Sequence, residues 1–230
     1  MRAMILAAGR GERMRPLTDH CPKPLLPAAG KPLIVYHLER LAAAGFREIV
    51  INHAHLGEQL VAALGNGDRW GLSIVWSPEP VGALETAGGI RQALIHLDVG
   101  NDAPFLVVNG DIYCDWPIQP HALLANDLAH LVLVGNPPQH PDGDFALTGD
   151  RVSDKTDDFP SLTFSGIGFY RPSLFASLTS GKAAKLAPLL RAAMAHSQVS
   201  GEHHRGRWED VGTPERLALL DTELRIGTSR

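Results

Sequence analysis

The opening residues place glycine and positive charge directly after an apolar segment. Residues 9–13 read Gly-Arg-Gly-Glu-Arg, and Lys23 follows between two prolines. Backbone N–H groups around Gly9 and Gly11 can form a nest that binds an anion. The planar guanidinium of Arg13 can bind phosphate oxygens, and Lys23 can add a point charge. This segment therefore predicts a site for a phosphorylated ligand.

Two common phosphate-binding motifs do not fit this segment. A dinucleotide-binding turn requires G-x-G-x-x-G, but Met14 stands where the third glycine is needed. A P-loop ends in G-K-[ST], and the segment has no such ending. The pattern thus argues against a nicotinamide-dependent oxidoreductase and against a P-loop enzyme.

Apolar and amphipathic segments alternate along the chain, and this alternation predicts an α/β fold with a mainly parallel, mixed sheet. Strands are expected at 3–8, 47–52, 72–77, 104–109, 130–135 and 162–171. Helices are expected at 31–45, 57–65, 85–97, 185–195 and 213–225, with a further helix before residue 130. Residues 144–153 are expected to form a hairpin around a glycine-containing turn. We expect residues 1–230 to form a single domain.

The distribution of charge is more informative than its sum. The formal net charge is −4, yet residues 1–31 hold six Lys and Arg side chains against two carboxylates. This balance favours one focused anion site and argues against nucleic acid, which requires a broad basic face. The two cysteines lack metal-type spacing and are typical of a reducing compartment. With no run of 18 apolar residues, we expect a cytoplasmic protein without a signal peptide or membrane span.

Four segments together resemble motifs of the sugar-1-phosphate nucleotidylyltransferase family. Residues 6–27, LAAGRGERMRPLTDHCPKPLLP, are similar to the family's G-x-G-x-R-x-x-P-[LA]-T segment and the lysine that follows it. VNGD at 108–111 and WEDVGTPERL at 208–217 resemble its two metal-binding aspartate segments. ETAGGI at 85–90 resembles its nucleotide-side segment, with Glu85 where glycine is common.

Within the family, one branch is most similar. The departure at Glu85, KLAPLLR at 185–191 and SGEHHRGRWEDVGT at 200–213 resemble the branch that makes UDP-N-acetylmuramic acid from UTP and N-acetylmuramate 1-phosphate in cell-wall recycling. The resemblance implies the Rossmann-like, three-layer fold of nucleotide-diphospho-sugar transferases. It also implies attack by the sugar phosphate on the α-phosphate of the nucleotide, with release of pyrophosphate.

The resemblance also implies a catalytic set of four residues. Both reactants are anionic, so fixed cations and a metal ion suit the reaction. Mg²⁺ accepts one or two carboxylates together with phosphate oxygens, and Asp111 and Asp210 are the expected ligands. Arg13 is expected to neutralise the leaving pyrophosphate, and Lys23 to hold the α-phosphate.

Further contacts are assigned by the same resemblance. The expected nucleotide-binding residues are Ala8, Gly9, Gly11, Glu12, Arg13, Lys23, Leu84 and Glu85. The expected sugar-binding residues are Asn109, Asp144, Ser165, Gly166 and Lys185. The lactyl carboxylate of N-acetylmuramate would be read by Arg205, Arg207 or Lys185, or accommodated by space near Ser165.

Other interpretations stay open at this point. The base could be that of GTP or CTP, and the sugar could be mannose or heptose phosphate. A non-catalytic nucleotide-sensing subunit would be favoured by loss of a metal carboxylate or signature cation, and all four residues are present. No short strand periodicity of a β-helix follows residue 171, so we expect a monomer. His53 and His55, and the pair His203 and His204, are interpreted as surface or structural histidines.

Overall fold

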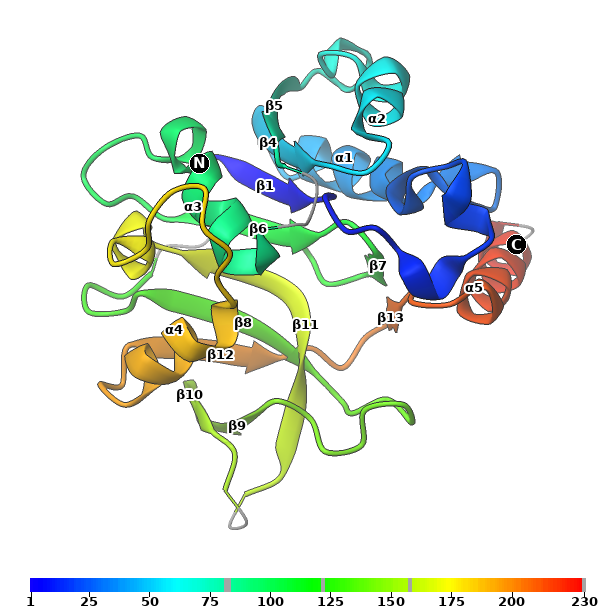
Figure 1. The fold of residues 1–230 in the computed structure, drawn as a ribbon. Coiled ribbons are helices and arrows are strands. Elements are labelled where there is room, and N and C mark those ends of the chain that lie inside the picture. Colours follow the sequence, from blue (N-terminus) through cyan, green and yellow to red (C-terminus); the bar gives the residue numbers. More distant parts are fainter. Residues whose placement is uncertain (81–83, 121–122, 157–158, 229–230) are drawn as a thin grey trace. The chain divides into compact units, whose positions relative to one another are not determined.

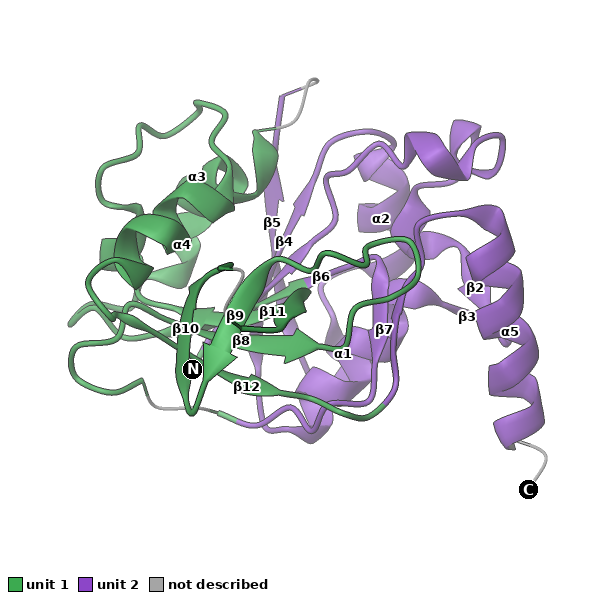
Figure 2. Ribbon diagram, turned by 90° about the horizontal axis from the view of Figure 1, so that it is seen from below, with its two compact units in different colours: residues 1, 84–108, 120–206 green, residues 2–83, 109–119, 207–230 purple. Residues whose placement is uncertain are grey.

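A computed structural model gives the fold for residues 1–80, 84–120, 123–156 and 159–228. The chain divides into two compact units (Figure 2). Unit 1 comprises residues 1, 84–108 and 120–206, and unit 2 comprises residues 2–83, 109–119 and 207–230. Each unit is thus assembled from segments that lie far apart in the sequence.

Three parallel strands form the sheet of unit 2, in the order β5-β4-β1 (Figure 1). They are β1 (Ala3–Leu6), β4 (Glu48–His53) and β5 (Ser73–Pro78). Parallel strands need crossover connections, which contain helices α1 (Leu33–Ala43) and α2 (Gly57–Leu64). Ile5 pairs with Ile51 and both are fully buried, so the strands read as apolar runs.

The remaining elements of unit 2 are short strands, 3-10 turns and one 15-residue helix, and a hydrophobic cluster links several of them. They are β2 (Pro27–Ala28), β3 (Lys31–Pro32), β7 (Ile112–Cys114), β13 (Trp208–Asp210), α5 (Pro214–Thr228) and the 3-10 turns η1 (Glu12–Met14), η2 (Leu17–Asp19), η3 (Lys23–Leu25) and η4 (Asp68–Trp70). The cluster consists of Met14, Leu26, Ala28, Leu33, Val211, Leu217 and Leu220. Burying a Leu or Met side chain contributes about 1.5–3 kcal/mol. The cluster therefore holds the loop between β1 and β2, here called the glycine-containing loop, against α5.

Unit 1 contains six strands in the order β6-β11-β8-β12-β10-β9. They are β6 (Phe105–Asn109, whose last residue belongs to unit 2), β8 (Ala129–Val134), β9 (Phe145–Thr148), β10 (Arg151–Asp154), β11 (Ser161–Tyr170) and β12 (Val199–His203). β11 pairs antiparallel with β6 and β8, whereas β12 pairs parallel with β8. Helices α3 (Glu85–Leu97) and α4 (Leu186–Met194) contact each other, and both contact the 3-10 turn η5 (Pro172–Phe175).

The predicted α/β class with a mixed sheet is confirmed, as is the hairpin of β9 and β10 around Gly149. Most described pairings of unit 1 are antiparallel, so this unit is less parallel than predicted. The helix expected before residue 130 is wrong: residues 117–120 and 123–128 hold none. Pro117 and Pro120 lack the backbone donors that a continuing helix needs. None of the described helices is long and apolar enough to cross a bilayer.

Candidate active site

The loop that follows β1 is anchored by a buried asparagine. The backbone N–H of Ala7 donates to Oδ1 of Asn52 at 2.7 Å, and Nδ2 of Asn52 donates to Glu79 at 2.6 Å. Asn52 is 3% exposed and is the second-to-last residue of the neighbouring strand β4. Because a buried amide must satisfy its hydrogen bonds, this side chain fixes where the loop leaves the sheet. The sequence gave no signal for this role, since Asn52 lies outside every motif.

Gly11 brings the loop against Lys23. Gly11 has a φ of +68°, a left-handed conformation that favours glycine, and its carbonyl accepts from Thr18 Oγ1 at 2.8 Å. A Cβ at this position would lie 3.0 Å from Cγ2 of Thr18 and 3.2 Å from Cβ of Lys23. Glycine thus allows the backbone and the lysine to approach closely, as the predicted anion site requires.

Lys23 and Asp111 form an ion pair at the end of β1. The Nζ atom of Lys23 lies 2.7 Å from Oδ2 of Asp111, and the lysine side chain is only 8% exposed. Asp111 is placed by its neighbour Gly110, whose N–H donates to the carbonyl of Leu6 at 2.9 Å. A Cβ on Gly110 would lie 2.7 Å from that oxygen, so the close approach excludes other residues. The structure therefore brings two predicted catalytic residues together.

Asp210 ends β13, and β13 pairs with β7, the strand that begins directly after Asp111. β13 pairs antiparallel with β7, with Asp210 opposite Ile112, and Val211 N–H donates to the carbonyl of Asp111 at 3.1 Å. A second ion pair holds its carboxylate, because Nη1 of Arg216 lies 2.7 Å from Oδ2. Arg216 belongs to the quoted aspartate motif but was not predicted as a site residue. The feature of the sequence that could have pointed to Arg216 is its position six residues after Asp210, at the start of helix α5.

Arg13 reaches the same region from the glycine-containing loop. A Cβ on Gly212 would lie 3.2 Å from Nη2 of Arg13 and 3.1 Å from Oδ2 of Asp210. Unit 2 therefore brings together all four predicted catalytic residues: Lys23 is paired with Asp111, Arg13 and Asp210 both border Gly212, and β7 and β13 join the two aspartate segments. Glu12 and Gly9 are exposed on the loop, Ala8 is buried, and Asn109 ends β6 half-buried.

Unit 1 brings three other predicted residues together. The N–H of Ala184 donates to the carbonyl of Leu84 at 3.0 Å, and Ala87 N–H donates back to Ala184 at 2.9 Å. This exchange places Lys185, the residue before α4, beside the start of α3. Glu85 is the first residue of α3, exposed, with a φ of +58° that is rare for a non-glycine residue.

A second predicted group gathers at a bulge in β11. The register against β8 shifts between Phe164 and Ile167, and the bulge contains Ser165 and Gly166, the latter with a φ of +84°. Oδ2 of Asp144 accepts from the N–H of Phe164 at 2.8 Å. The carboxylate of Asp144 therefore stabilises the bulge, whatever else it binds.

Residues 2–225 match the profile of the nucleotidyl transferase family. The chain belongs to this family. It is 56% identical to the N-acetylmuramate alpha-1-phosphate uridylyltransferase of Neisseria meningitidis serogroup B over 94% of this chain and 95% of that protein. It is 36% identical to the protein of the same name from Caulobacter vibrioides over 97% and 96% of the two chains. A crystal structure described as a glucose-1-phosphate thymidylyltransferase from Bacillus anthracis has a TM-score of 0.82 at 21% identity, covering 98% of this chain and 95% of that one, and so shares the fold.

The donor set of this nucleotidyltransferase suits a hard divalent cation. Asp111, directly before β7, and Asp210, at the end of the paired strand β13, offer carboxylate oxygens, and Mg²⁺ in phosphate-transfer sites commonly uses one or two carboxylates with phosphate oxygens. The described residues contain no group of three or more His, Cys, Asp or Glu arranged to hold a metal. A metal ion here would therefore need oxygens from a bound phosphate group as well as from the protein.

Two titratable groups behind the site have shifted pKa values. Complete burial lowers the pKa of His37 to about 4, with a further contribution from the positive charge of Arg40. His37 lies on α1, and this helix contacts β7, the short strand that follows Asp111. Partial burial raises the pKa of Glu209, and the nearby charge of Glu223 adds to this effect. His37 therefore adds no charge near Asp111 at neutral pH.

Arg207 and His55, two other residues considered in the sequence analysis, have structural contacts. Arg207 donates to Glu223 and lies over the ring of Tyr113, 5.0 Å from its centroid. His55 lies 2.8 Å from Nη1 of Arg10, and its Nε2 lies 3.2 Å from the carbonyl of Thr18. His55 thus supports the glycine-containing loop of the nucleotidyltransferase.

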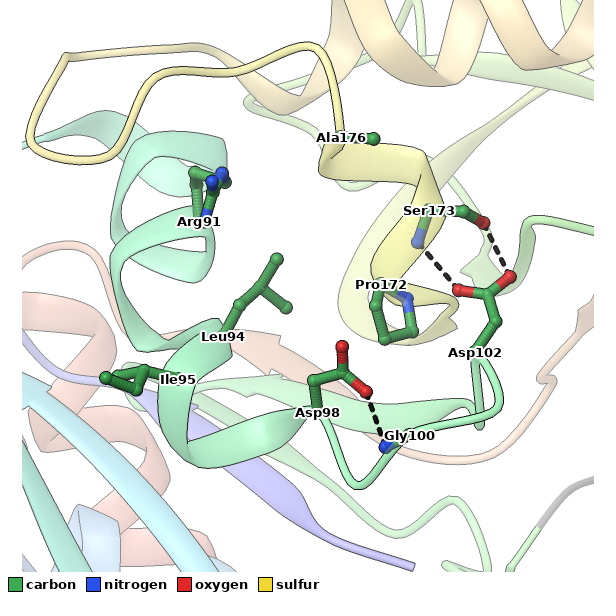
Figure 3. Close-up of a pocket in the computed structure, with 9 residues that line it drawn as sticks. All are labelled: Arg91, Leu94, Ile95, Asp98, Gly100, Asp102, Pro172, Ser173 and Ala176. Atoms are coloured by element: carbon green, nitrogen blue, oxygen red, sulfur yellow. Dashed lines mark hydrogen bonds between the residues drawn. The ribbon is translucent and has the colours of Figure 1, made fainter.

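A separate hollow lies in unit 1 (Figure 3). It is lined by Arg91, Leu94, Ile95, Asp98, Gly100, Asp102, Pro172, Ser173 and Ala176. The carboxylate of Asp102 accepts from the N–H and Oγ of Ser173, at 2.8 and 2.7 Å, and so caps the turn η5. No predicted site residue is among those that line this hollow.

Proposed function

We propose that this chain transfers a uridylyl group from UTP to N-acetylmuramic acid 1-phosphate, giving UDP-N-acetylmuramic acid and pyrophosphate. The observation that carries the proposal is the 56% identity to the meningococcal uridylyltransferase, which extends over almost the full length of both proteins. The second relative of that name, at 36% identity, covers the chain equally well. A cytoplasmic monomer made of one domain is part of the same proposal.

The chemistry of the reaction accounts for the residues of unit 2. The attacking phosphate oxygen is already ionised, so the reaction needs no general base, and its main barriers are electrostatic repulsion and orientation. We assign Lys23 to the α-phosphate, where negative charge increases in the transition state, and Arg13 to the departing pyrophosphate. The loop from Ala8 to Glu12 would bind the remaining phosphate oxygens through backbone N–H groups.

We assign Asp111 and Asp210 to a Mg²⁺ ion. When bound, the ion would neutralise phosphate charge and help orient the two reactants. The pairing of β7 with β13 supports this assignment, because it sets Asp210 opposite Ile112, the residue after Asp111. Each carboxylate already accepts a hydrogen bond from a cationic side chain, Asp111 from Lys23 and Asp210 from Arg216.

The substrate-specific contacts belong to the proposal as well. We assign Leu84 and Glu85 to the nucleotide, and Asn109, Asp144, Ser165, Gly166 and Lys185 to the sugar phosphate. Hydroxyl, amide and carboxylate groups suit sugar hydroxyls because they accept or donate hydrogen bonds at fixed positions. Lys185 is exposed and Arg207 is paired with Glu223, so Lys185 is the better candidate for the lactyl carboxylate.

Competition between substrates tests the proposal. N-acetylmuramic acid 1-phosphate and N-acetylglucosamine 1-phosphate, at equal concentration, are mixed with UTP and Mg²⁺, and the products are resolved by mass. We expect the muramyl product in clear excess, because a site built for a charged group discriminates more strongly than one that senses a methylene. Parallel reactions with GTP and CTP measure base preference, and Asp111→Asn provides the background.

Equal use of both sugars, or preference for a mannose or heptose phosphate, would overturn the muramate assignment. Such a result would leave the family membership intact, since pyrophosphate would still be released. Absence of pyrophosphate with every nucleotide and sugar phosphate would overturn the catalytic assignment itself.

A further inference from the structure

Arg216 holds the carboxylate of Asp210 from the first turn of α5. Its Nη1 atom donates to Oδ2 of Asp210 at 2.7 Å and to the backbone carbonyl of the same residue at 3.2 Å. The two side chains are 23% and 27% exposed, so the pair is largely screened from water yet open on one side. The guanidinium thus fixes both the main chain and the side chain of a proposed metal ligand.

The backbone of Gly212 brings a second guanidinium to the same carboxylate. A Cβ on Gly212 would lie 3.1 Å from Nη1 of Arg216, 3.1 Å from Oδ2 of Asp210 and 3.2 Å from Nη2 of Arg13. The guanidinium groups of Arg13 and Arg216 and the carboxylate of Asp210 therefore all border the space beside Gly212. A phosphate group in that space could accept hydrogen bonds from both guanidinium groups.

The other proposed metal ligand has the same arrangement. Asp111 accepts from Nζ of Lys23 at 2.7 Å, so each of the two carboxylates is paired with a cation. A divalent ion that binds these oxygens competes with both cations. Each cation that it displaces becomes available to a phosphate group.

We propose that Arg216 is a further phosphate-binding residue, which Asp210 holds until a divalent cation takes that carboxylate. The inference rests on the proposed function of this site in binding a metal and a nucleoside triphosphate. It goes beyond that function by assigning Arg216 and by coupling the two ligands. The metal ion displaces the guanidinium of Arg216 from Asp210, so that the guanidinium can bind the phosphates. The bound phosphates in turn keep the guanidinium away from the Asp210 oxygen that binds the metal. Because such coupling is reciprocal, each ligand binds more tightly in the presence of the other.

The test measures the affinity of the protein for Mn²⁺ and for UTP. A purely structural role of Arg216 would change both affinities in the same direction. Binding of Mn²⁺ alone is followed by electron paramagnetic resonance, and binding of UTP at saturating Mg²⁺ by calorimetry. In Arg216→Met we expect Mn²⁺ alone to bind about threefold or more tightly, because its competitor is gone. We expect UTP to bind about tenfold more weakly, because a phosphate contact is lost.

Matched variants separate this role from a general loss of structure. Arg225→Met removes the same charge from the same helix, at a residue whose guanidinium pairs with Asp221 at 2.7 Å, and both constants should stay unchanged. Arg216→Lys retains a positive charge and should recover most of the UTP affinity. Asp210→Asn combined with Arg216→Met should abolish the gain in Mn²⁺ affinity.

Opposite changes of the two constants in Arg216→Met support the proposal. Unchanged or weaker Mn²⁺ binding, or unchanged UTP binding, overturns it and leaves Arg216 as a structural partner of Asp210. Failure of the unmodified chain to bind either ligand overturns the proposed function, and this inference with it. If the unmodified chain binds both but uses another sugar, the muramate assignment alone fails.

Discussion

Replacing His37 should remove a pH-dependent loss of stability from the protein. His37 is fully buried on α1, and burial lowers its pKa from 6.5 to about 4. In the unfolded chain the imidazole takes up a proton near pH 6.5, whereas in the folded chain it stays neutral down to about pH 4. Protonation therefore favours the unfolded state throughout this interval, and stability falls as the pH falls from 6.5 to 4.

The size of the effect follows from the shift. Each pKa unit corresponds to about 1.4 kcal/mol, so His37 should cost roughly 1 kcal/mol of unfolding free energy between pH 7.5 and pH 5.5. By pH 4 the cost should reach about 3 kcal/mol. Nothing further is lost to this residue below pH 4, because both states are then protonated.

Urea unfolding of wild type and His37→Gln between pH 5 and pH 7.5 measures this effect. The variant should show a flatter dependence of unfolding free energy on pH, with a slope that differs by close to one proton at pH 5 and by about half a proton on average between pH 5 and pH 7.5. The comparison concerns slopes, so a general loss of stability in the variant does not affect it. His196→Gln, at an exposed histidine, is the control and should keep the wild-type slope. Equal slopes in wild type and His37→Gln would refute the reasoning.

Asp111→Asn and Asp210→Asn should each lower turnover by at least about 100-fold with little change in Tm, and chelation should reproduce the loss in wild type. Near-normal turnover in either variant would remove that residue from the metal site. Lys23→Ala should lower kcat by about 10²–10³-fold and change KM for UTP less, because its charge matters most in the transition state; a change confined to KM would make it a ground-state anchor. Glu85→Gly should raise the unfolding free energy by about 1 kcal/mol by relieving the positive φ, and should weaken UTP binding. A lower unfolding free energy, or unchanged UTP binding, would argue against a functional reason for Glu85.

Elements with a strong apolar period were predicted well from the sequence. The expected helix at 85–97 is α3, and the expected strand at 130–135 is β8, shifted by one residue. β12 was missed because Gly201 and its polar neighbours interrupt the apolar pattern. The structure explains that glycine: a Cβ there would lie 2.8 Å from the carbonyl of Leu131 on the paired strand. β7 and β13 are three residues each, too short to give a periodic signal.

A candidate site could be proposed from the sequence where residue types and motifs imply chemistry. The glycines, Arg13 and Lys23 indicated a phosphate site, and the family resemblance of VNGD and WEDVGTPERL indicated Asp111 and Asp210 as metal ligands. Asn52 and Arg216 were not predicted, because their roles depend on backbone atoms that the fold brings to them. A carbonyl or an N–H group is present at every residue, so the sequence cannot mark those that a side chain will use.

The hydrophobic cluster of unit 2 sets an order in which the protein can mature on the ribosome. Met14 and Leu26, from the loop, pack with Leu217 and Leu220, from α5, and the N–H of Ala29 donates to Asp221 at 2.8 Å. The partners of the loop are thus synthesised about 200 residues after it. A nascent chain stalled before α5 would expose the apolar side of its glycine-containing loop, a target for chaperones and proteases. Catalytic competence should therefore appear only once α5 has left the exit tunnel.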